Sequence, residues 1–245
     1  MNLYRADLHI HTALSPCGSL DMSPRNLLEA AAEKGLDIIG ITDHNSTLQA
    51  PVIREMAKAY GIFVINGAEI TSVEEVHCLC LVSHENIKAL QNYIDKYIMK
   101  TPNNPEKLGH QPLVDQDAQI FRLVPHSLHG ALNQSISQIQ ATVAQMKGIF
   151  IPAHIDRPMF SIMSQLGFIP QDLPFDALEM CRHTPAQSLW KKQPHLKNKS
   201  FIRSSDAHQP QDVGAAYTLL KMHHRSFEEV KKCLNCLNDR KPIIT

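Results

Sequence analysis

The sequence has no apolar run that approaches the ~20 residues needed to cross a membrane as a helix. Its charges balance, with 24 Lys and Arg against 24 Asp and Glu, so no overall field favours a long nucleic acid or an anionic membrane. The first residues show no charged segment followed by an apolar one, which predicts a cytoplasmic chain without a signal peptide. The 6 cysteines are therefore expected to be reduced thiols.

Histidine, by contrast, is abundant, with 14 copies in the chain. Imidazole is the commonest metal ligand in proteins, so this excess raises the question of a metal site. Residues 7–11 read Asp-Leu-His-Ile-His. Alternate residues of a strand face the same way, which puts His9 and His11 on one face about 6–7 Å apart. Two neutral imidazoles at this separation can bind one divalent cation.

Apolar runs alternate with helical patterns along the chain, which predicts βα units and a largely parallel sheet. Ser23 with Pro24, and Ser135 with Gln138, have the patterns that begin helices. Residues 101–125 interrupt the alternation and predict a long loop or small insertion, of the kind that often covers a site. Strands are expected at residues 5–11, 36–41, 62–66, 76–82, 149–153, 176–180, 201–204 and 217–222. Seven or eight strands without a repeat fit one α/β barrel domain better than two domains.

Several motifs place a His, Asp or Glu at or just past the end of an apolar run. They are Gly-Ile-Thr-Asp-His at 40–44, Gly-Ala-Glu-Ile at 67–70, Glu-Val-His at 75–77, Ile-Pro-Ala-His at 151–154 and Ser-Asp-Ala-His at 205–208. In an α/β barrel the reactive groups lie at the carboxyl ends of the strands. We therefore expect these side chains to share one pocket with His9 and His11.

The ordered motifs resemble the PHP family, named for polymerase and histidinol phosphatase, over about residues 5–214. The resemblance implies a distorted TIM-like (β/α)7 barrel, with residues 1–245 as a single domain. It also implies hydrolysis of phosphate esters at a cluster of up to three divalent metals. The ligand sets implied are His9, His11, Glu69 and Asp206 for one metal, Glu69, His77 and His154 for a second, and His44 and His208 for a third.

The third metal site departs from the family pattern. Many members place an aspartate where this chain has Pro16, so Cys17 is the nearest candidate ligand and Asp21 the next. A thiolate favours zinc or iron over manganese, whereas mixed imidazole and carboxylate ligands suit zinc, manganese or iron. We expect two or three divalent ions per chain.

The chemistry of phosphate ester hydrolysis requires such a cluster. Cations neutralise the ester, lower the pKa of bound water toward ~7 and hold the attacking and leaving oxygens, so a metal-bridging hydroxide is the expected nucleophile. We expect Asp206 and His208 to take part in catalysis. Arg157 is the candidate phosphate clamp, because a guanidinium matches phosphate oxygens bidentately. Asp7 and Asp43 lie beside ligand histidines and are expected to orient their rings.

The substrate is expected to be a small phosphorylated metabolite, a nucleotide or the end of a short oligonucleotide, rather than a long nucleic acid. Histidinol phosphate remains an alternative. Two other classes stay open: an amidohydrolase with related metal chemistry, and a non-catalytic metal-binding barrel, which the missing aspartate at Pro16 favours. His126 and His129 lie in an irregular stretch, where a solvated loop is favoured and contact with the substrate is the alternative.

Overall fold

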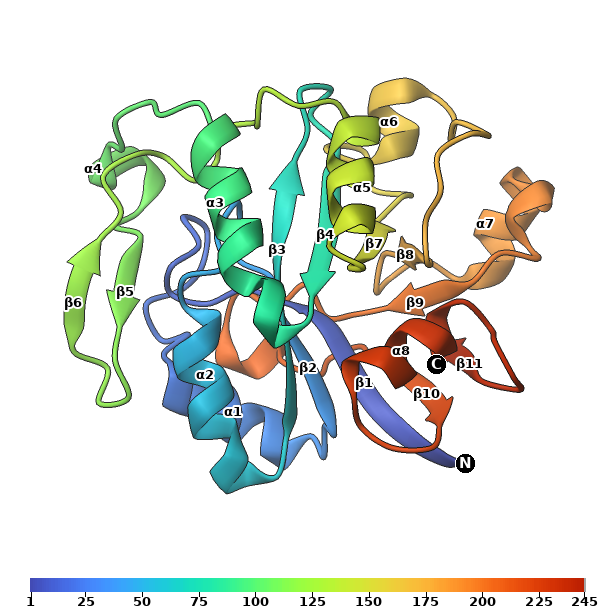
Figure 1. Ribbon diagram of the computed structural model, residues 1–245, viewed down its shortest axis with the longest axis horizontal. Coiled ribbons are helices and arrows are strands. Elements are labelled where there is room, and N and C mark those ends of the chain that lie inside the picture. Colours follow the sequence, from blue (N-terminus) through green and yellow to red (C-terminus); the bar gives the residue numbers. More distant parts are fainter. Residues whose placement is uncertain (245) are drawn as a thin grey trace.

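A computed structural model describes residues 1–244, which form a mixed α/β fold around a curled half-barrel sheet (Figure 1). The sheet has seven strands in the order β11-β10-β1-β2-β3-β4-β7. Its strands are β1 (Asn2–Ile10), β2 (Ile38–Ile41), β3 (Phe63–Thr71), β4 (His77–Val82), β7 (Ile149–Pro152), β10 (Thr218–Met222) and β11 (Lys241–Ile244). Two ribbons stand apart from it: β5 (Pro112–Val114) with β6 (Ile120–Leu123), and β8 (Leu178–Met180) with β9 (Phe201–Arg203).

A closed (β/α)7 barrel is not confirmed, because β8 and β9 pair only with each other in the part of the chain that is described. β9 is linked to β10 by the side chain of Thr218 rather than by a ladder of backbone hydrogen bonds. The Thr218 hydroxyl accepts a hydrogen bond from the Arg203 N–H and donates one to the Arg203 carbonyl, both at 2.8 Å. A side chain thus joins β9 to β10, the strand next to the edge strand β11 of the seven-stranded sheet.

Two helices begin where the sequence predicts. The Ser23 hydroxyl accepts from the Asn26 N–H, and Ser135 and Gln138 form both bonds of a capping box. None of the helices within residues 1–244 is long and apolar enough to cross a membrane. The helices are α1 (Pro24–Glu33), α2 (Ala50–Ala57), α3 (Ile87–Tyr97), α4 (Pro105–Leu108), α5 (Ile136–Gln145), α6 (Ile162–Leu166), α7 (Ala186–Lys192) and α8 (Phe227–Leu234). Short 3-10 turns are η1 (Lys58–Tyr60), η2 (His84–Asn86), η3 (Pro194–Leu196) and η4 (Pro210–Asp212).

The expectation of a largely parallel sheet is wrong. β1–β2 and β2–β3 are parallel, but β3–β4, β4–β7, β1–β10 and β10–β11 are antiparallel. The physical reason is clearest between β3 and β4, where residues 72–76 are too few for the crossover of a dozen or more residues that parallel strands need. As a result Thr71, the last residue of β3, pairs with His77, the first residue of β4.

This hairpin changes how Glu69 and His77 reach the site. β3 extends to Thr71, beyond the predicted end at residue 66, so Glu69 lies inside the strand rather than after it. His77 is the first residue of β4 and does not follow an apolar run. Both side chains still arrive at one edge, because an antiparallel strand begins where its partner ends.

Residues 101–125 contain regular structure, where a long loop or small insertion was predicted. They form α4 and the β5–β6 hairpin, seen in green at the side of the molecule in Figure 1. The side chain of Gln49 bonds both the N–H and the carbonyl of Val114, at 3.0 and 2.8 Å, and so fixes β5 to the start of α2.

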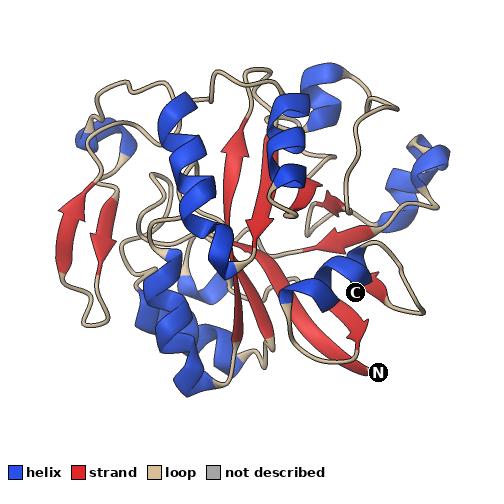
Figure 2. Ribbon diagram, in the orientation of Figure 1, coloured by secondary structure: helices blue, strands red, loops and turns tan. Residues whose placement is uncertain are grey.

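The largest core cluster lies where α3 and α5 cover β3, β4 and β7 (Figure 2). Leu90, Ile94, Ile139 and Val143 of the two helices belong to one buried cluster with Phe150. Each such buried side chain stabilises the fold by about 1.5–3 kcal/mol relative to exposure. The strands that carry the histidines therefore rest on a packed scaffold.

Candidate metal centre

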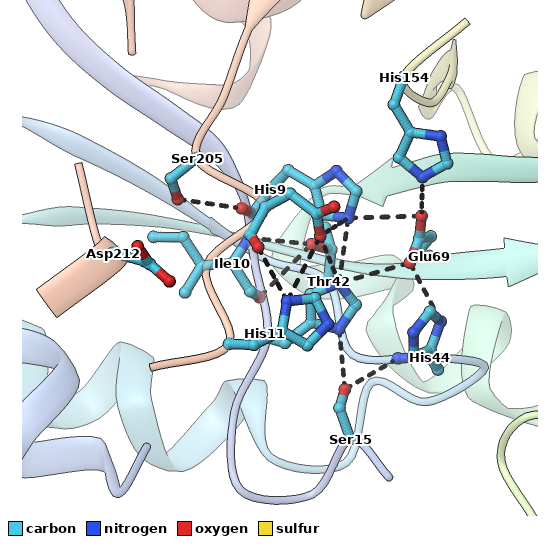
Figure 3. Close-up of polar contacts among 12 residues, drawn as sticks. His9, Ile10, His11, Ser15, Thr42, His44, Glu69, His154, Ser205 and Asp212 are labelled. Atoms are coloured by element: carbon cyan, nitrogen blue, oxygen red, sulfur yellow. Dashed lines mark hydrogen bonds and ion pairs between the residues drawn. The ribbon is translucent and has the colours of Figure 1, made fainter. Parts of the chain in front are cut away.

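The carboxylate of Glu69 lies at the centre of the site and is 1% exposed. Figure 3 shows its two oxygens directed at imidazoles from several strands and loops. Glu69 Oε1 is 2.9 Å from His77 Nδ1, 3.0 Å from His154 Nε2 and 3.4 Å from His9 Nε2, and Oε2 is 3.0 Å from His44 Nδ1 and 3.4 Å from His11 Nε2. Five predicted ligands thus meet one carboxylate.

Asp206 is the second carboxylate of the cluster. Its Oδ1 is 3.4 Å from His9 Nε2, 3.3 Å from His11 Nε2 and 3.6 Å from His208 Nδ1. The Nε2 atoms of His9 and His11 are only 3.1 Å apart. Two imidazole nitrogens converging on one carboxylate oxygen are a donor set that suits a divalent cation.

These residues fit a cluster of divalent metals. Among residues 1–244, three groups of side chains bring one ligand atom each to within 4.8 Å of the others. The groups are His9, His11 and Asp206, then His44, Glu69 and His77, then His11, His44 and His208. His154 contacts Glu69, while its buried Nδ1 has no hydrogen-bond partner. Imidazole and carboxylate donors suit zinc, manganese or iron.

The charges of the site depend on each other. Burial opposes ionisation of Glu69, but His77, His9 and His44 hold its pKa well below the usual range. Burial likewise favours the neutral ring of His11, yet hydrogen bonds to Asp206 and Glu69 raise its pKa to about 9. A cation bound here would compete with the protons on these rings, so metal binding is expected to release protons.

Other rings of the cluster are held neutral. Burial lowers the pKa of His44 to about 3 and that of His208 to about 4. Neutral imidazole is the form that binds metals. The Nδ1 of His208 lies 2.8 Å from the carbonyl oxygen of Asp206. This contact orients the ring through Nδ1 and leaves Nε2 as the nitrogen available to a metal.

Glu179 belongs to the site although it was not among the predicted residues. Its Oε2 lies 2.9 Å from His9 Nδ1 and accepts from the His154 backbone N–H at 3.0 Å, and the residue is 2% exposed. The bond to Nδ1 leaves His9 Nε2 directed at the cluster. An acid within the predicted apolar strand at 176–180 was the signal available, because buried carboxylates need a partner.

Asp43 orients the His11 ring through the hydroxyl of Ser15. Its Oδ1 accepts from the Ser15 hydroxyl at 2.7 Å, and that hydroxyl oxygen lies 2.9 Å from His11 Nδ1. Asp43 also accepts from the N–H and the hydroxyl of Thr12, at 2.7 and 2.8 Å. These bonds fix the turn that carries His11.

Asp7 bonds to backbone N–H groups, whereas a bond to a histidine ring was expected. It accepts from the N–H groups of Ser205 and Gly214, both at 3.0 Å. It therefore fixes the loop around Asp206, whose φ of +51° is in the left-handed region. His154 also has a positive φ, +29°. Such strain costs about 1–3 kcal/mol per residue and clusters at functional sites.

We expect Asp43→Asn to weaken metal binding and any metal-dependent turnover by about 10- to 100-fold, as for other partners of metal ligands. The amide offers one acceptor oxygen where three donors from Thr12 and Ser15 now converge. Calorimetric titration with Zn²⁺ or Mn²⁺ measures the effect. Asp239→Asn is the matched control, because Asp239 is exposed and remote in the chain. Unchanged metal affinity in Asp43→Asn would contradict this role.

The structure does not join Cys17 or Asp21 to the cluster. Cys17 is exposed, and none of the three ligand groups within residues 1–244 includes either residue. An additional ligand to the third metal therefore stays a prediction. His129, expected in a solvated loop, is exposed but lies beside the site, with its ring centroid 5.8 Å from that of His44.

A cavity of about 500 Å³ adjoins the cluster. Asp206, His208 and Glu179 line it together with Arg157 and Arg182. Arg157 pairs with Asp206 Oδ2 at 3.0 Å, and Arg182 with Asp212 Oδ1 at 3.2 Å. The predicted phosphate-binding arginine thus stands beside the predicted metal ligands, at the wall of a space large enough for a small ligand.

Comparison with known proteins gives local sequence matches and a match over the whole fold. The chain is 36% identical over 78 residues to an uncharacterized protein of Methanocaldococcus jannaschii, covering 29% of this chain and 46% of the relative. It is 32% identical over 89 residues to phosphoribosyl 1,2-cyclic phosphate 1,2-diphosphodiesterase of Eggerthella lenta, covering 34% of this chain and 33% of the relative. The chain thus spans less than half of these relatives.

Among solved structures, the lesion-specific endonuclease PfuEndoQ of Pyrococcus furiosus has the same fold, with a TM-score of 0.72 and 18% identity. The match covers 98% of this chain and 58% of that one. A family model described as PHP-associated matches residues 195–234. The model of the PHP domain matches residues 7–156, more than half of the chain and five of the six motifs, and the chain therefore belongs to the PHP domain family.

Proposed function

We propose that the protein is a metal-dependent phosphoesterase that hydrolyses a small phosphorylated metabolite, a nucleotide or a short oligonucleotide. The observation that carries the proposal is the Glu69 carboxylate among five imidazoles, next to the convergence of His9, His11 and Asp206. Family membership and the phosphoesterase and endonuclease neighbours support a metal-dependent hydrolase of phosphoester bonds.

Divalent ions bound by this cluster would neutralise phosphate charge and activate water. Glu69 bridges the imidazole groups, and Asp206 and His208 close the cluster on the side of the cavity. Arg157 reaches the same side from the loop after β7, where its guanidinium can donate two parallel hydrogen bonds to phosphate oxygens. The cluster is proposed to bind two or three ions of zinc, manganese or iron.

Nucleic acid is a second candidate substrate. Endonuclease Q has been solved with a 27-mer duplex carrying an abasic lesion at the active site, and its fold matches this chain at a TM-score of 0.74. The balanced charge of this chain favours a short substrate over a long polymer, because a long anion needs a basic surface. A small substrate also agrees with the size of the cavity.

A panel of phosphoesters tests the proposal. It comprises AMP, bisphosphonucleotides, short RNA, histidinol phosphate, an abasic DNA duplex and simple amides, each with added Mn²⁺, Zn²⁺ or Fe²⁺. Metal-dependent release of phosphate or cleavage of an oligonucleotide supports the proposal and names the substrate class. Amide cleavage alone would favour the amidohydrolase alternative. A metal-loaded protein inert to the whole panel would favour a non-catalytic barrel.

Arg157→Met is expected to lower kcat/KM for the best phosphoester by about 10- to 100-fold, since a hydrogen bond to a charged group contributes about 1.5–3 kcal/mol. Arg157→Lys should be intermediate, because lysine keeps the charge but not the planar pair of donors. Arg25→Met, on the exposed face of α1, is the matched control. Full kcat/KM in Arg157→Met would show that Arg157 serves only as a partner of Asp206.

A further inference from the structure

Two large apolar side chains, Met159 and Phe160, stand exposed on the loop between β7 and α6. Their exposed fractions are 61% and 38%. Neither belongs to a hydrophobic cluster of the described chain or packs on one as a partly buried residue. The hydrophobic effect alone therefore gives little reason for a phenylalanine at this position.

The backbone nevertheless holds Phe160 in place. Its φ of +58° is in the left-handed region, which is unfavourable for a bulky residue and costs about 1–3 kcal/mol. Its carbonyl accepts from the His77 N–H at 2.9 Å, so the loop is tied to the start of β4. Its ring stacks on the His77 imidazole, with centroids 4.8 Å apart and planes at 11°.

The same loop reaches the cluster at two points. Arg157 pairs with Asp206, and three residues later Phe160 covers His77, whose Nδ1 is 2.9 Å from Glu69. The exposed ring of His129 also borders the cluster, because its centroid is 5.8 Å from that of His44, which in turn is 5.2 Å from that of His77. An exposed aromatic rim of Phe160 and His129 thus borders His77 and His44.

We propose that Phe160 determines specificity by stacking against a planar ring in the leaving group of the substrate, as a nucleobase presents. One side of the phenyl ring rests on His77, and its exposed fraction leaves surface for a second ring. Stacking on an aromatic side chain is available to every base and requires no particular hydrogen-bond pattern. This inference rests on the proposed function and assigns to that site a preference for nucleotides over phosphorylated sugars.

The test compares AMP with ribose 5-phosphate, which has the same phosphorylated ribose without the base. Binding affinity and kcat/KM are measured for both ligands with the metal-loaded wild type, Phe160→Leu, Phe160→Tyr and Phe168→Leu. Phe168 is the matched control, because it is 63% exposed and forms no ring stack among the described residues. Thermal unfolding establishes that each variant is folded.

The wild type should bind AMP more tightly than ribose 5-phosphate. Phe160→Leu should lose about 5- to 100-fold in affinity for AMP only, and Phe160→Tyr should retain it. Equal affinity of the wild type for both ligands, or unchanged AMP binding by Phe160→Leu, would overturn the inference. An equal loss for both ligands would also overturn it, by showing that Phe160 only covers His77. Selective AMP binding without turnover would contradict the proposed function and leave the stacking role intact.

Discussion

Glu69→Gln is expected to lower phosphoester turnover by at least ~10³-fold. The carboxylate contacts five imidazoles within 3.4 Å, and an amide would offer one neutral oxygen and one NH₂ group in its place. Metal ions contribute several kcal/mol to stabilising a phosphoryl transition state. Each 1.36 kcal/mol of that stabilisation is a factor of ten in rate. Turnover of the best panel substrate, measured at saturating metal, gives the size of the effect.

Two controls separate this role from a loss of the fold. Glu228→Gln changes an exposed glutamate in the first turn of α8 and should keep full activity. Circular dichroism of Glu69→Gln should show the secondary structure of the wild type, since β3 keeps its backbone pairing with β2 and β4. A folded Glu69→Gln protein with more than a tenth of the wild-type turnover would contradict the central position of Glu69.

Removal of metal with a chelator is expected to abolish activity and to lower the melting temperature by about 5–10 °C. A ligand at 100 times its Kd stabilises the folded state by about 2.7 kcal/mol. In a chain of this size, 1 kcal/mol shifts the melting temperature by about 2–4 °C. The folded site is expected to be less stable without cations, because the Nε2 atoms of His9 and His11 lie only 3.1 Å apart, where one cation can bind both. Differential scanning calorimetry with and without EDTA measures the shift.

Restoring Mn²⁺, Zn²⁺ or Fe²⁺ should recover both activity and melting temperature, and the ion that recovers both identifies the working metal. Glu69→Gln provides an internal control, because its melting temperature should respond less to the chelator. A wild-type melting temperature and turnover that are both insensitive to EDTA would show that no exchangeable metal occupies the cluster.

Strand ends were the reliable part of the prediction from sequence. His44, His154 and Asp206 follow short strands, and the structure brings them to one cluster with His9 and His11. The local sequence pattern is enough to locate where a buried strand ends. Local pattern does not determine the direction of the neighbouring strand, so the antiparallel pairing of β3 with β4 could not be predicted from it.

Residues that act through tertiary contacts were less predictable. Glu179 touches His9 across 170 positions of sequence, and no local spacing indicates that bond. Ser15 links Asp43 to His11 within a turn whose residues resemble an ordinary loop. Phe160 had no signal, because an aromatic residue in a loop is as common on a plain surface as beside a site. Such roles follow from the packing of the whole chain.

The metal content of the purified protein is the most direct test of the central claim. Elemental analysis after loading with Zn²⁺, Mn²⁺ or Fe²⁺ should find two or three divalent ions per chain in the wild type and fewer in Glu69→Gln. The wild-type value follows from three groups of converging ligand atoms that are linked through His11 and His44. The lower value follows from loss of the Glu69 carboxylate, which contacts five imidazoles. A wild-type protein that binds no ion under any loading condition would contradict the account.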